Sequence, residues 1–276
     1  NSLIKLGHNF NTNSDTEVII HSYEEWGSEC VKYFNGMWAF CIYDINEKIA
    51  FLSRDRFGIK PLKYSYVNNQ LYFASETKAI LPLLEKKATP NKTKIVNFIK
   101  ESEGIFSKDT WFNEIKNLEP GTNLIFKDNY IKFEKYFRSF EKSHDRLSNN
   151  YLNELDRSIK LRLNSDVPVA FTISSGVDST SIALIAKKYI SNLKCYNAKF
   201  NHDESEHKLS SKFCLDNDLS IDFSVNHFSS YDDAKKLIYH LESGHQSTAI
   251  FPLFSLYKQI SKDGYKVVLE GQGACL

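Results

Sequence analysis

A short loop at residues 174–179 (SSGVDS) has the side chains that phosphate sites use. It follows a continuous apolar run at 169–173, which is typical of a buried parallel strand, and a helical pattern begins directly after it. In this arrangement the free N–H groups at the helix start point at an anion, and the helix dipole favours negative charge. The hydroxyls of Ser174 and Ser179 add donors, and Asp178 offers a carboxylate for the Mg²⁺ that accompanies a triphosphate. The sequence therefore predicts a phosphate site.

The loop lacks the Gly-Lys-Ser/Thr ending of a Walker P-loop and the spacing of a dinucleotide-binding motif. It resembles the Ser-Gly-Gly-x-Asp-Ser loop of the ATP-pyrophosphatase superfamily, whose members cleave ATP between the α and β phosphates. The alternative is a serine-rich turn that binds nothing. A second loop of small residues, 270–273 (EGQG), ends another apolar strand.

The second half of the chain alternates between strand and helix patterns, which predicts a doubly wound parallel α/β sheet with its ligand at the carboxyl ends of the strands. A helix is expected from 148 to about 163. The strands that follow are expected at 169–173, 194–200, 221–225 and 266–269, and the helices between them at 178–190, 205–217, 231–242 and 252–263.

The first half, to about residue 137, predicts an antiparallel, layered α+β domain because its strands pair as hairpins. Ser14 and Glu17 suggest a capping box for a helix that Gly27 ends. A buried strand is expected at 37–43, two hairpins turn at 68–69 and 127–129, and Ser75 is expected to cap a short helix. The charged loop 54–62 has Gly and Pro at its bends, and its simplest interpretation is a solvated, salt-bridged turn. A linker is placed at 138–147.

Composition narrows the class of protein. The 276 residues suffice for two domains, and a net charge of +1 with interspersed charges favours neither nucleic acid nor membrane partners. Five scattered cysteines lack metal-ligand spacing, and no apolar run is long enough to span a membrane. We expect a soluble cytoplasmic protein. The chain starts without methionine and stops within a pattern, which suggests a fragment.

Six stretches occur in the order and spacing of known motifs: 14–19 (SDTEVI), 35–44 (NGMWAFCIYD), 54–62 (RDRFGIKPL), 71–76 (LYFASE), 165–179 (SDVPVAFTISSGVDS) and 268–274 (VLEGQGA). Through them the chain resembles the glutamine-hydrolysing asparagine synthetases over nearly its whole length. The resemblance implies a four-layer N-terminal-nucleophile glutaminase domain at 1–140 and an ATP-pyrophosphatase-like synthetase domain at 148–276, both partial. It also implies glutamine, aspartate and ATP as substrates, Mg²⁺ as cofactor, and a possible homodimer.

In that family, aspartate attacks the α-phosphorus of MgATP to give β-aspartyl-AMP, and ammonia from glutamine then displaces AMP. Carried over by motif, Asp15 resembles the carboxylate that holds the glutamine α-amino group; from the sequence pattern alone it is only a favourable charge at a helix start. The remaining positions resemble nucleotide contacts: Ile173, Ser174, Ser175, Gly176, Val177, Asp178 (also a Mg²⁺ ligand), Ser179, Lys199, Glu270 and Gly271. Gln272 stands where some members have a glutamate tied to acyl-adenylate formation.

Three departures from the family pattern stand out. No cysteine occupies the first position, so this chain alone is not expected to hydrolyse glutamine, and Cys30 and Cys41 are expected to be packed thiols. Ser175 replaces a glycine where the backbone approaches phosphate, which is tolerable if its φ is negative. Cys275 and Leu276 replace Asp-Glu, and a thiol is too soft a ligand for Mg²⁺.

Two other functions stay open. The first is a related amidotransferase that acts on another carboxylate, a sugar acid or a peptide. The second is a non-catalytic remnant that binds nucleotide weakly. The segment 242–254 is where acceptor contacts are expected: His245, Gln246, Ser247 and Thr248 either bind the acceptor or simply begin a helix.

Overall fold

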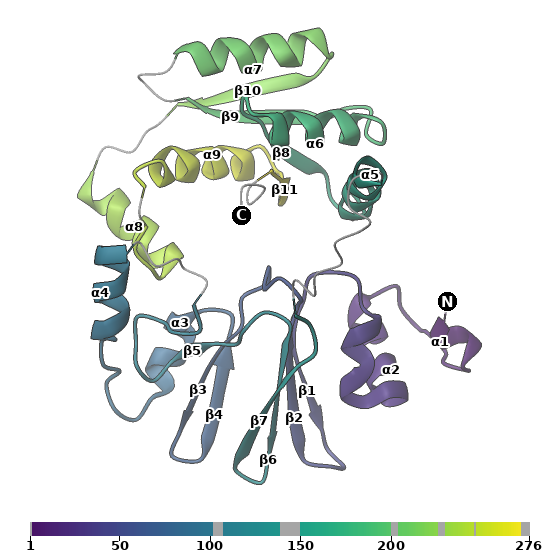
Figure 1. The fold of residues 1–276 in the computed structure, drawn as a ribbon, viewed down its shortest axis with the longest axis vertical. Helices are drawn as coiled ribbons and strands as arrows, with labels where there is room; N and C mark the ends of the chain where they lie inside the picture. The colour runs from purple at the N-terminus through teal and green to yellow at the C-terminus, as the bar shows by residue number, and fades with distance from the viewer. Residues whose placement is uncertain are drawn as a thin grey trace. The chain divides into compact units, whose positions relative to one another are not determined.

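The computed structural model describes residues 2–101, 107–138, 150–199, 204–225, 230–245 and 247–271. The chain divides into two compact units, Asn1–Lys142 and Ser143–Leu276, each with its own sheets and core (Figure 1). Most of the predicted linker lies outside the described residues. Within the described part of the chain, no helix combines the length and the apolar character needed to cross a membrane.

The first unit contains two antiparallel sheets. The larger has the order β1-β2-β6-β7, with strands Ala39–Asp44, Ile49–Arg54, Thr122–Lys127 and Tyr130–Lys135. The smaller has the order β4-β3-β5, with β3 at Lys63–Val67, β4 at Gln70–Ala74 and β5 at Lys116–Asn117. Both predicted hairpins are confirmed. Their turns hold positive φ angles at Asn68, Asn69, Asp128 and Asn129, as two-residue hairpins require.

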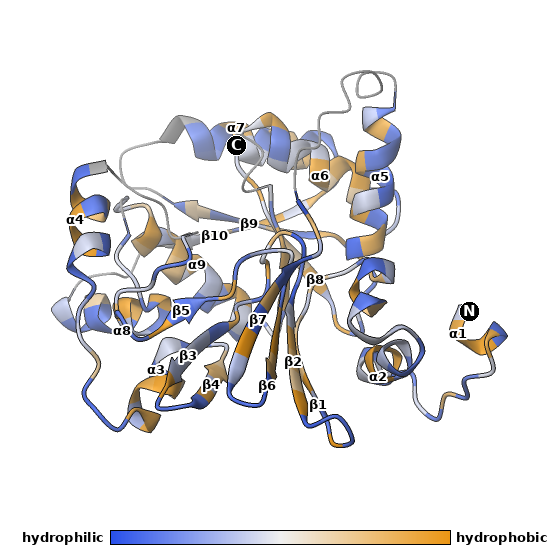
Figure 2. Ribbon diagram, turned by 60° about the horizontal axis from the view of Figure 1, so that its bottom comes forward, coloured by the Kyte–Doolittle hydropathy of each residue, from blue (hydrophilic) through white to orange (hydrophobic). Residues whose placement is uncertain are grey.

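The larger sheet is buried on both faces. Leu52 and Leu124 pack with Tyr64 of the smaller sheet, so the two sheets lie face to face. On the opposite face, Phe51 packs with Val31, close to the helix α2 (Asp15–Trp26). In Figure 2 strands β1, β2 and β6 are mostly hydrophobic, whereas the short strand β5 is hydrophilic. The layers therefore run helix, sheet, sheet, as the predicted layered α+β domain requires.

The remaining elements of this unit are short helices at its edges. They are α1 (Ser2–Lys5), η1 (Gly27–Tyr33), α3 (Thr77–Ile80), η2 (Leu81–Leu83) and α4 (Lys92–Glu101).

Several local expectations for this unit were wrong or only partly right. Ser14 does cap α2, but its side chain accepts from Thr16 N, and Glu17 accepts from the N–H groups of Asn11 and Thr12 instead of closing a capping box. Glu76 takes the cap position predicted for Ser75, but its side chain does not cap the helix. Strand β1 is half-buried, not fully buried.

The second unit is a four-stranded parallel sheet in the order β10-β9-β8-β11. Its strands are β8 (Val169–Thr172), β9 (Lys194–Lys199), β10 (Ser220–Val225) and β11 (Val267–Leu269). Its helices are α5 (Tyr151–Arg162), α6 (Val177–Lys187), α7 (Glu204–Asp216), α8 (Tyr231–Leu241) and α9 (Ile250–Lys262). The alternation predicted from the sequence is confirmed, with bounds that differ by a few residues.

Helices cover both faces of this sheet. Side chains alternate along each strand, so successive residues pack against helices on opposite faces. Phe171 of β8 packs with residues of α5, α6 and α7 on one face. The preceding residue, Ala170, packs with Leu256 and Ile260 of α9 on the opposite face. Figure 1 shows α6 and α7 on one side and α9 on the opposite side. The sheet is therefore doubly wound.

Candidate functional site

The start of α6 is open to a ligand. Gly176 precedes the helix in an extended conformation (φ −74°, ψ 151°) and provides no side-chain cap. The first-turn N–H groups of an α-helix have no acceptor within the helix, so these groups are available to an anion. Among them are the N–H groups of Val177 and Asp178.

The two serines of the loop are held in place by each other. Ser174 Oγ and Ser179 Oγ lie 2.9 Å apart, and Ser179 Oγ accepts from the N–H of Ser174 at 3.0 Å. Ser174 Oγ in turn accepts from the N–H of Gly176 at 3.1 Å. Both hydroxyls line a cavity of about 280 Å³, as do Gly176 and the carboxylate-bearing Asp178. The loop is therefore ordered before any ligand arrives.

Ser175 and Val177 differ from the other loop residues, since neither lines the cavity. Both are exposed. Among the described residues, Ser175 is absent from those with positive φ, so a side chain at this position strains nothing.

The second small-residue loop lies directly against the first. A Cβ atom on Gly271 would come within 3.1 Å of Ser179 N and 3.2 Å of Asp178 Cβ. Such distances are too short for an ordinary contact, so only glycine fits here without displacing the helix start. The loop after β11 thus closes one wall of the same cavity.

The strand order explains why the two loops meet. Strand β8 pairs in parallel with β9 on one side and with β11 on the other, so the segments that follow β8 and β11 emerge side by side at the same edge of the sheet. Ligands of open parallel sheets typically bind in a crevice at the carboxyl ends of the strands. The cavity lies in this crevice, with residues 172–174 and 270–271 on its two sides.

Glu270 is fixed at the cavity by neighbouring hydroxyls. Tyr257 of α9 donates a hydrogen bond to Glu270 Oε2 at 2.6 Å, and Thr172 donates to the same oxygen at 3.4 Å. Burial, and then the hydrogen bond to Glu270, raise the pKa of the Tyr257 phenol. Tyr257 therefore stays a neutral donor that orients the carboxylate.

The backbone of Ile173 is already engaged. Its N–H donates to the carbonyl of Tyr196 at 2.9 Å, and its carbonyl accepts from Asn197 Nδ2 at 2.6 Å. Asn197 is buried in β9, lines the cavity and lies 3.2 Å from His207 Nδ1 through its Oδ1. Sequence reasoning missed Asn197. The available signal was an amide side chain in the uncharged interior of a strand that has a lysine at each end.

The remaining sequence-predicted residues are less closely tied to this cavity. Lys199 ends β9, beside β8, but its side chain lines a separate pocket with His207, Lys208 and Phe223. Gln272, Cys275 and Leu276 lie outside the described residues.

The expected acceptor segment forms a turn before α9. His245 Nδ1 accepts from Ser247 N at 3.1 Å, and Ser247 Oγ accepts from Ala249 N at 3.1 Å. These contacts match the simpler prediction of a polar helix start. Gln246 lies outside the described residues, and Leu253 of the same segment is the residue that reaches the cavity.

The first unit holds its own cavity, of about 630 Å³, at the start of α2. Asp15, the first residue of the helix, lines this cavity together with residues 37–43, which comprise most of β1 and the two residues before it. Lys60 contributes a cationic side chain to the same lining. A cavity with one carboxylate and one ammonium group suits a ligand that carries both charges, such as a free amino acid.

Lys60 is positioned by a buried carboxylate. Asp55 is 1% exposed and accepts three backbone hydrogen bonds, from Phe57 N (3.1 Å), Ile59 N (3.0 Å) and Lys60 N (2.9 Å). Arg54 donates to the carbonyls of Gly58, Lys60 and Leu118. The simplest interpretation of 54–62, a solvated, salt-bridged turn, holds only in part: Phe57, Ile59 and Lys60 are exposed, but Arg54 and Asp55 bind backbone groups and fold the loop.

The described cysteines are free thiols. Burial raises the pKa of both Cys30 and Cys41 to about 11, so neither is a thiolate near neutral pH. Cys195 and Cys214 are buried, and a hydrogen bond between them together with burial raises the pKa of Cys195. The expectation of packed thiols at Cys30 and Cys41 is confirmed, although Cys41 is only partly buried and lines the cavity of Asp15.

Comparison with protein families gives two matches. A family described as "Glutamine amidotransferase domain" matches residues 1–137, and a family described as "Asparagine synthase" matches residues 150–274.

Curated relatives carry both parts in one chain. The chain is 32% identical to a putative glutamine-hydrolysing asparagine synthetase of Methanocaldococcus jannaschii, over 98% of this chain and 55% of that protein. It is 28% identical to asparagine synthetase [glutamine-hydrolyzing] 1 of Bacillus subtilis, over 97% of this chain and 43% of that protein. The chain thus spans about half the length of these relatives.

Among solved structures, a glutamine phosphoribosylpyrophosphate amidotransferase from Bacillus subtilis aligns with 96% of this chain and 47% of its own. The sequence identity is 15% and the TM-score 0.36, which is too low to bear on the fold. The two family matches and the curated relatives show that the chain belongs to the glutamine-hydrolysing asparagine synthetase family.

Proposed function

We propose that the protein containing this chain converts aspartate, glutamine, ATP and water into asparagine, glutamate, AMP and pyrophosphate. The observation that carries the proposal is the crevice between β8 and β11. There an uncapped helix start, two fixed serine hydroxyls and a side-chain-free Gly271 surround one cavity.

This crevice suits a departing pyrophosphate. The N–H groups at the start of α6 and the hydroxyls of Ser174 and Ser179 are donors, and charge builds up on the bridging oxygen as the bond between the α and β phosphates breaks. Asp178 would hold the Mg²⁺ that partly neutralises the phosphates. Ile173, with both backbone groups engaged, would shape the wall of the nucleotide site rather than donate to it.

The reaction then proceeds in two displacements. An oxygen of the aspartate β-carboxylate attacks the α-phosphorus, pyrophosphate leaves, and β-aspartyl-AMP forms. Ammonia attacks the acyl carbon, and AMP leaves with the bonding electrons. Glu270, fixed by Tyr257, lies at the cavity where it can orient the amino group of aspartate or the incoming ammonia.

The first unit would supply the ammonia. Asp15 would pair with the glutamine α-amino group and Lys60 would face its α-carboxylate, because both charges line one cavity. In the complete protein we propose that this unit is a four-layer glutaminase of the N-terminal-nucleophile type.

A second candidate is amidation of a carboxylate other than that of aspartate. Two further relatives are named amidases: chyE of Penicillium rubens, at 26% identity over 95% of this chain, and chry2 of Gibberella zeae, at 28% over 68%. The segment expected to choose the acceptor, 242–254, forms a helix start whose polar groups bind one another.

Exchange of labelled pyrophosphate into ATP, measured on the complete protein, separates these proposals. Exchange that requires aspartate supports asparagine synthesis. Exchange that requires another carboxylic acid supports the second candidate. No exchange with any acid, from protein that binds ATP, would contradict both.

A further inference from the structure

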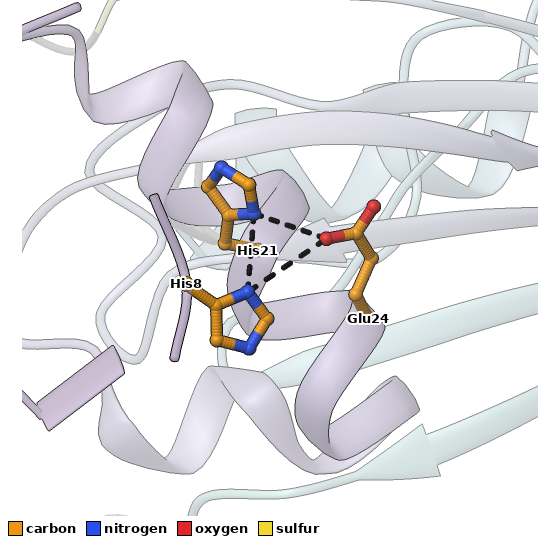
Figure 3. A group of neighbouring side chains, drawn as sticks. All are labelled: His8, His21 and Glu24. Carbon is orange, nitrogen blue, oxygen red and sulfur yellow. Dashed lines mark hydrogen bonds and ion pairs between the residues drawn. The ribbon is translucent and has the colours of Figure 1, made fainter. Parts of the chain in front are cut away.

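Three potential metal ligands of the first unit converge, and none of them lines the cavity of Asp15 (Figure 3). His8 lies between α1 and α2, while His21 and Glu24 lie three residues apart on α2. The Nδ1 atoms of the two histidines are 3.2 Å apart. Glu24 Oε2 is 3.0 Å from His21 Nδ1 and 3.9 Å from His8 Nδ1.

These separations match the edges of a tetrahedral metal site. Zn²⁺ binds imidazole nitrogen and carboxylate oxygen at about 2.0–2.2 Å, so neighbouring ligands of a tetrahedral ion lie roughly 3.3 Å apart. The two shorter separations in the cluster differ from that value by a few tenths of an ångström. A modest rotation of the exposed Glu24 side chain would shorten the third.

The outer nitrogens of both rings face carboxylates. His8 Nε2 lies 3.1 Å from Glu25 Oε2, and His21 Nε2 lies 3.7 Å from Glu17 Oε1. Metal-binding histidines typically donate their second N–H to a carboxylate, which fixes the tautomer and the orientation of the ring. With both protons on Nε2, the two Nδ1 lone pairs point toward the centre of the cluster.

Glu17 is itself anchored. It accepts from the N–H groups of Asn11 and Thr12, each at 2.7 Å. The carboxylate that orients His21 is therefore held by the segment that leads into α2.

In the absence of a metal ion the same contacts are hydrogen bonds, between His8 Nδ1 and His21 Nδ1 and between His21 Nδ1 and Glu24 Oε2, so a proton occupies the place that a cation would take. The histidine side chains are 15% and 21% exposed, so water screens them only in part. Glu24, at 57%, leaves room for a water molecule as the fourth ligand.

We propose that His8 Nδ1, His21 Nδ1 and Glu24 Oε2 bind one Zn²⁺ ion, with water in the fourth position. Imidazole with carboxylate is a donor set that suits zinc, and no sulfur ligand is needed. The ion would fasten the segment 8–14 to α2. Because that segment ends at Ser14, the cap of α2, the ion would also fix the helix start that carries Asp15. Zinc here is structural and takes no part in the amidation chemistry.

Metal binding to the full chain, prepared without a histidine tag, tests this proposal. After chelator treatment and dialysis, Zn²⁺ is added and the tightly bound metal is measured by mass spectrometry. Co²⁺ serves as a spectroscopic probe. The expected result is one Zn²⁺ per chain and the intense visible absorption of four-coordinate Co²⁺, which Zn²⁺ abolishes. Failure to retain one Zn²⁺ would overturn the proposal.

Variants identify the ligands. His21→Gln and Glu24→Gln are expected to lose stoichiometric zinc and the cobalt spectrum, whereas His240→Gln, which removes an exposed histidine on α8, keeps both. Glu25→Gln leaves all three ligands in place and should weaken zinc binding about tenfold or more. Circular dichroism shows whether each variant folds. If His21→Gln does not fold, the zinc affinity of Glu25→Gln tests the proposal in its place. Unchanged affinity in folded Glu24→Gln and Glu25→Gln would also overturn the proposal.

Discussion

Gly271 lies so close to Ser179 that a Cβ atom on the glycine would be 3.1 Å from the serine nitrogen. Gly271 follows β11, and Ser179 lies in the first turn of α6, which follows β8. The two residues are nearly one hundred positions apart in sequence. Their contact places a glycine of one loop against the helix start of the other, and so turns two separate small-residue motifs into one cavity.

Gly271→Ala should weaken ATP binding by about tenfold while the protein stays folded. The added methyl group collides with backbone atoms of Asp178 and Ser179, and overpacking of this kind typically costs about 1–3 kcal/mol. Titration calorimetry with MgATP measures the change. Gly36→Ala is the matched control, because a Cβ atom there meets nothing within 4 Å. Equal affinity in the two variants would show that the loop contact does not shape the ATP site.

Ser179→Ala should weaken pyrophosphate and ATP binding by about tenfold or more. It removes a donor at the cavity and releases the Ser174 N–H, and hydrogen bonds to charged groups are worth about 1.5–3 kcal/mol. Thr180→Ala is the control: it deletes the neighbouring hydroxyl, which bonds Gly176 O and does not line the cavity. The dependence of the exchange rate on the pyrophosphate and ATP concentrations reports both affinities. A loss in Thr180→Ala as large as in Ser179→Ala would point to helix damage instead.

Asp55→Asn should destabilise the first unit by about 1–3 kcal/mol, because an amide nitrogen replaces one of the oxygens that accept from the backbone in a buried site. It should also raise the KM for glutamine, since Lys60 N–H is one of its donors. Asp44→Asn is the control, because Asp44 accepts from the N–H groups of Asn46 and Glu47 in an exposed turn. This substitution should change the free energy of unfolding by less than about 0.5 kcal/mol, as an ordinary surface substitution does. Chemical denaturation compares the two; a smaller loss for Asp55→Asn would contradict the positioning role of this carboxylate.

Cys30 and Cys41 should resist alkylation near neutral pH. Burial raises their pKa values from 9.0 to about 11, so the thiolate is scarce in the folded state. Iodoacetamide treatment at pH 8.5, followed by peptide mass spectrometry, should label both far more slowly than in urea. Labelling of either residue at its rate in urea would contradict the prediction.

The same shifts predict how stability depends on pH. A thiol whose pKa is higher in the folded state binds its proton more tightly there, so its contribution to stability is complete below pH 9 and is lost as the pH rises toward 11. Burial raises the pKa of Tyr64 and Tyr136 in the same unit, and their contributions have the same sign. Thermal melts at pH 8 and pH 10.5 should therefore show a lower Tm at the higher pH. An unchanged or higher Tm would contradict this reading.

Sequence patterns predicted the parallel sheet and the loop 174–179 because strand and helix periodicity are local properties. They also placed the hairpin turns, since Asn68-Asn69 and Asp128-Asn129 are residue pairs that tolerate positive φ. Details that depend on distant partners were not predictable. Glu17 has the spacing of a capping box, yet the preceding loop supplies N–H groups that compete for its oxygens.

Contacts across the sheet were likewise hidden. Asn197 meets Ile173 O only because β9 lies beside β8, and Tyr257 meets Glu270 only because α9 packs on the face of the sheet that carries Ala170 and Val268. His8 and His21 are separated by a loop whose path no periodicity describes, so their convergence with Glu24 required the structure. Motif reasoning thus located the two small-residue loops that share the cavity but not the residues that hold them.

The most direct test of the account follows the nitrogen and the phosphates in one reaction. The complete protein is incubated with aspartate, MgATP and glutamine labelled with ¹⁵N in the side-chain amide. We expect ¹⁵N-labelled asparagine together with equal amounts of AMP and pyrophosphate. Formation of ADP and inorganic phosphate, or transfer of the label to a different carboxylate while aspartate stays unchanged, would contradict the proposed function.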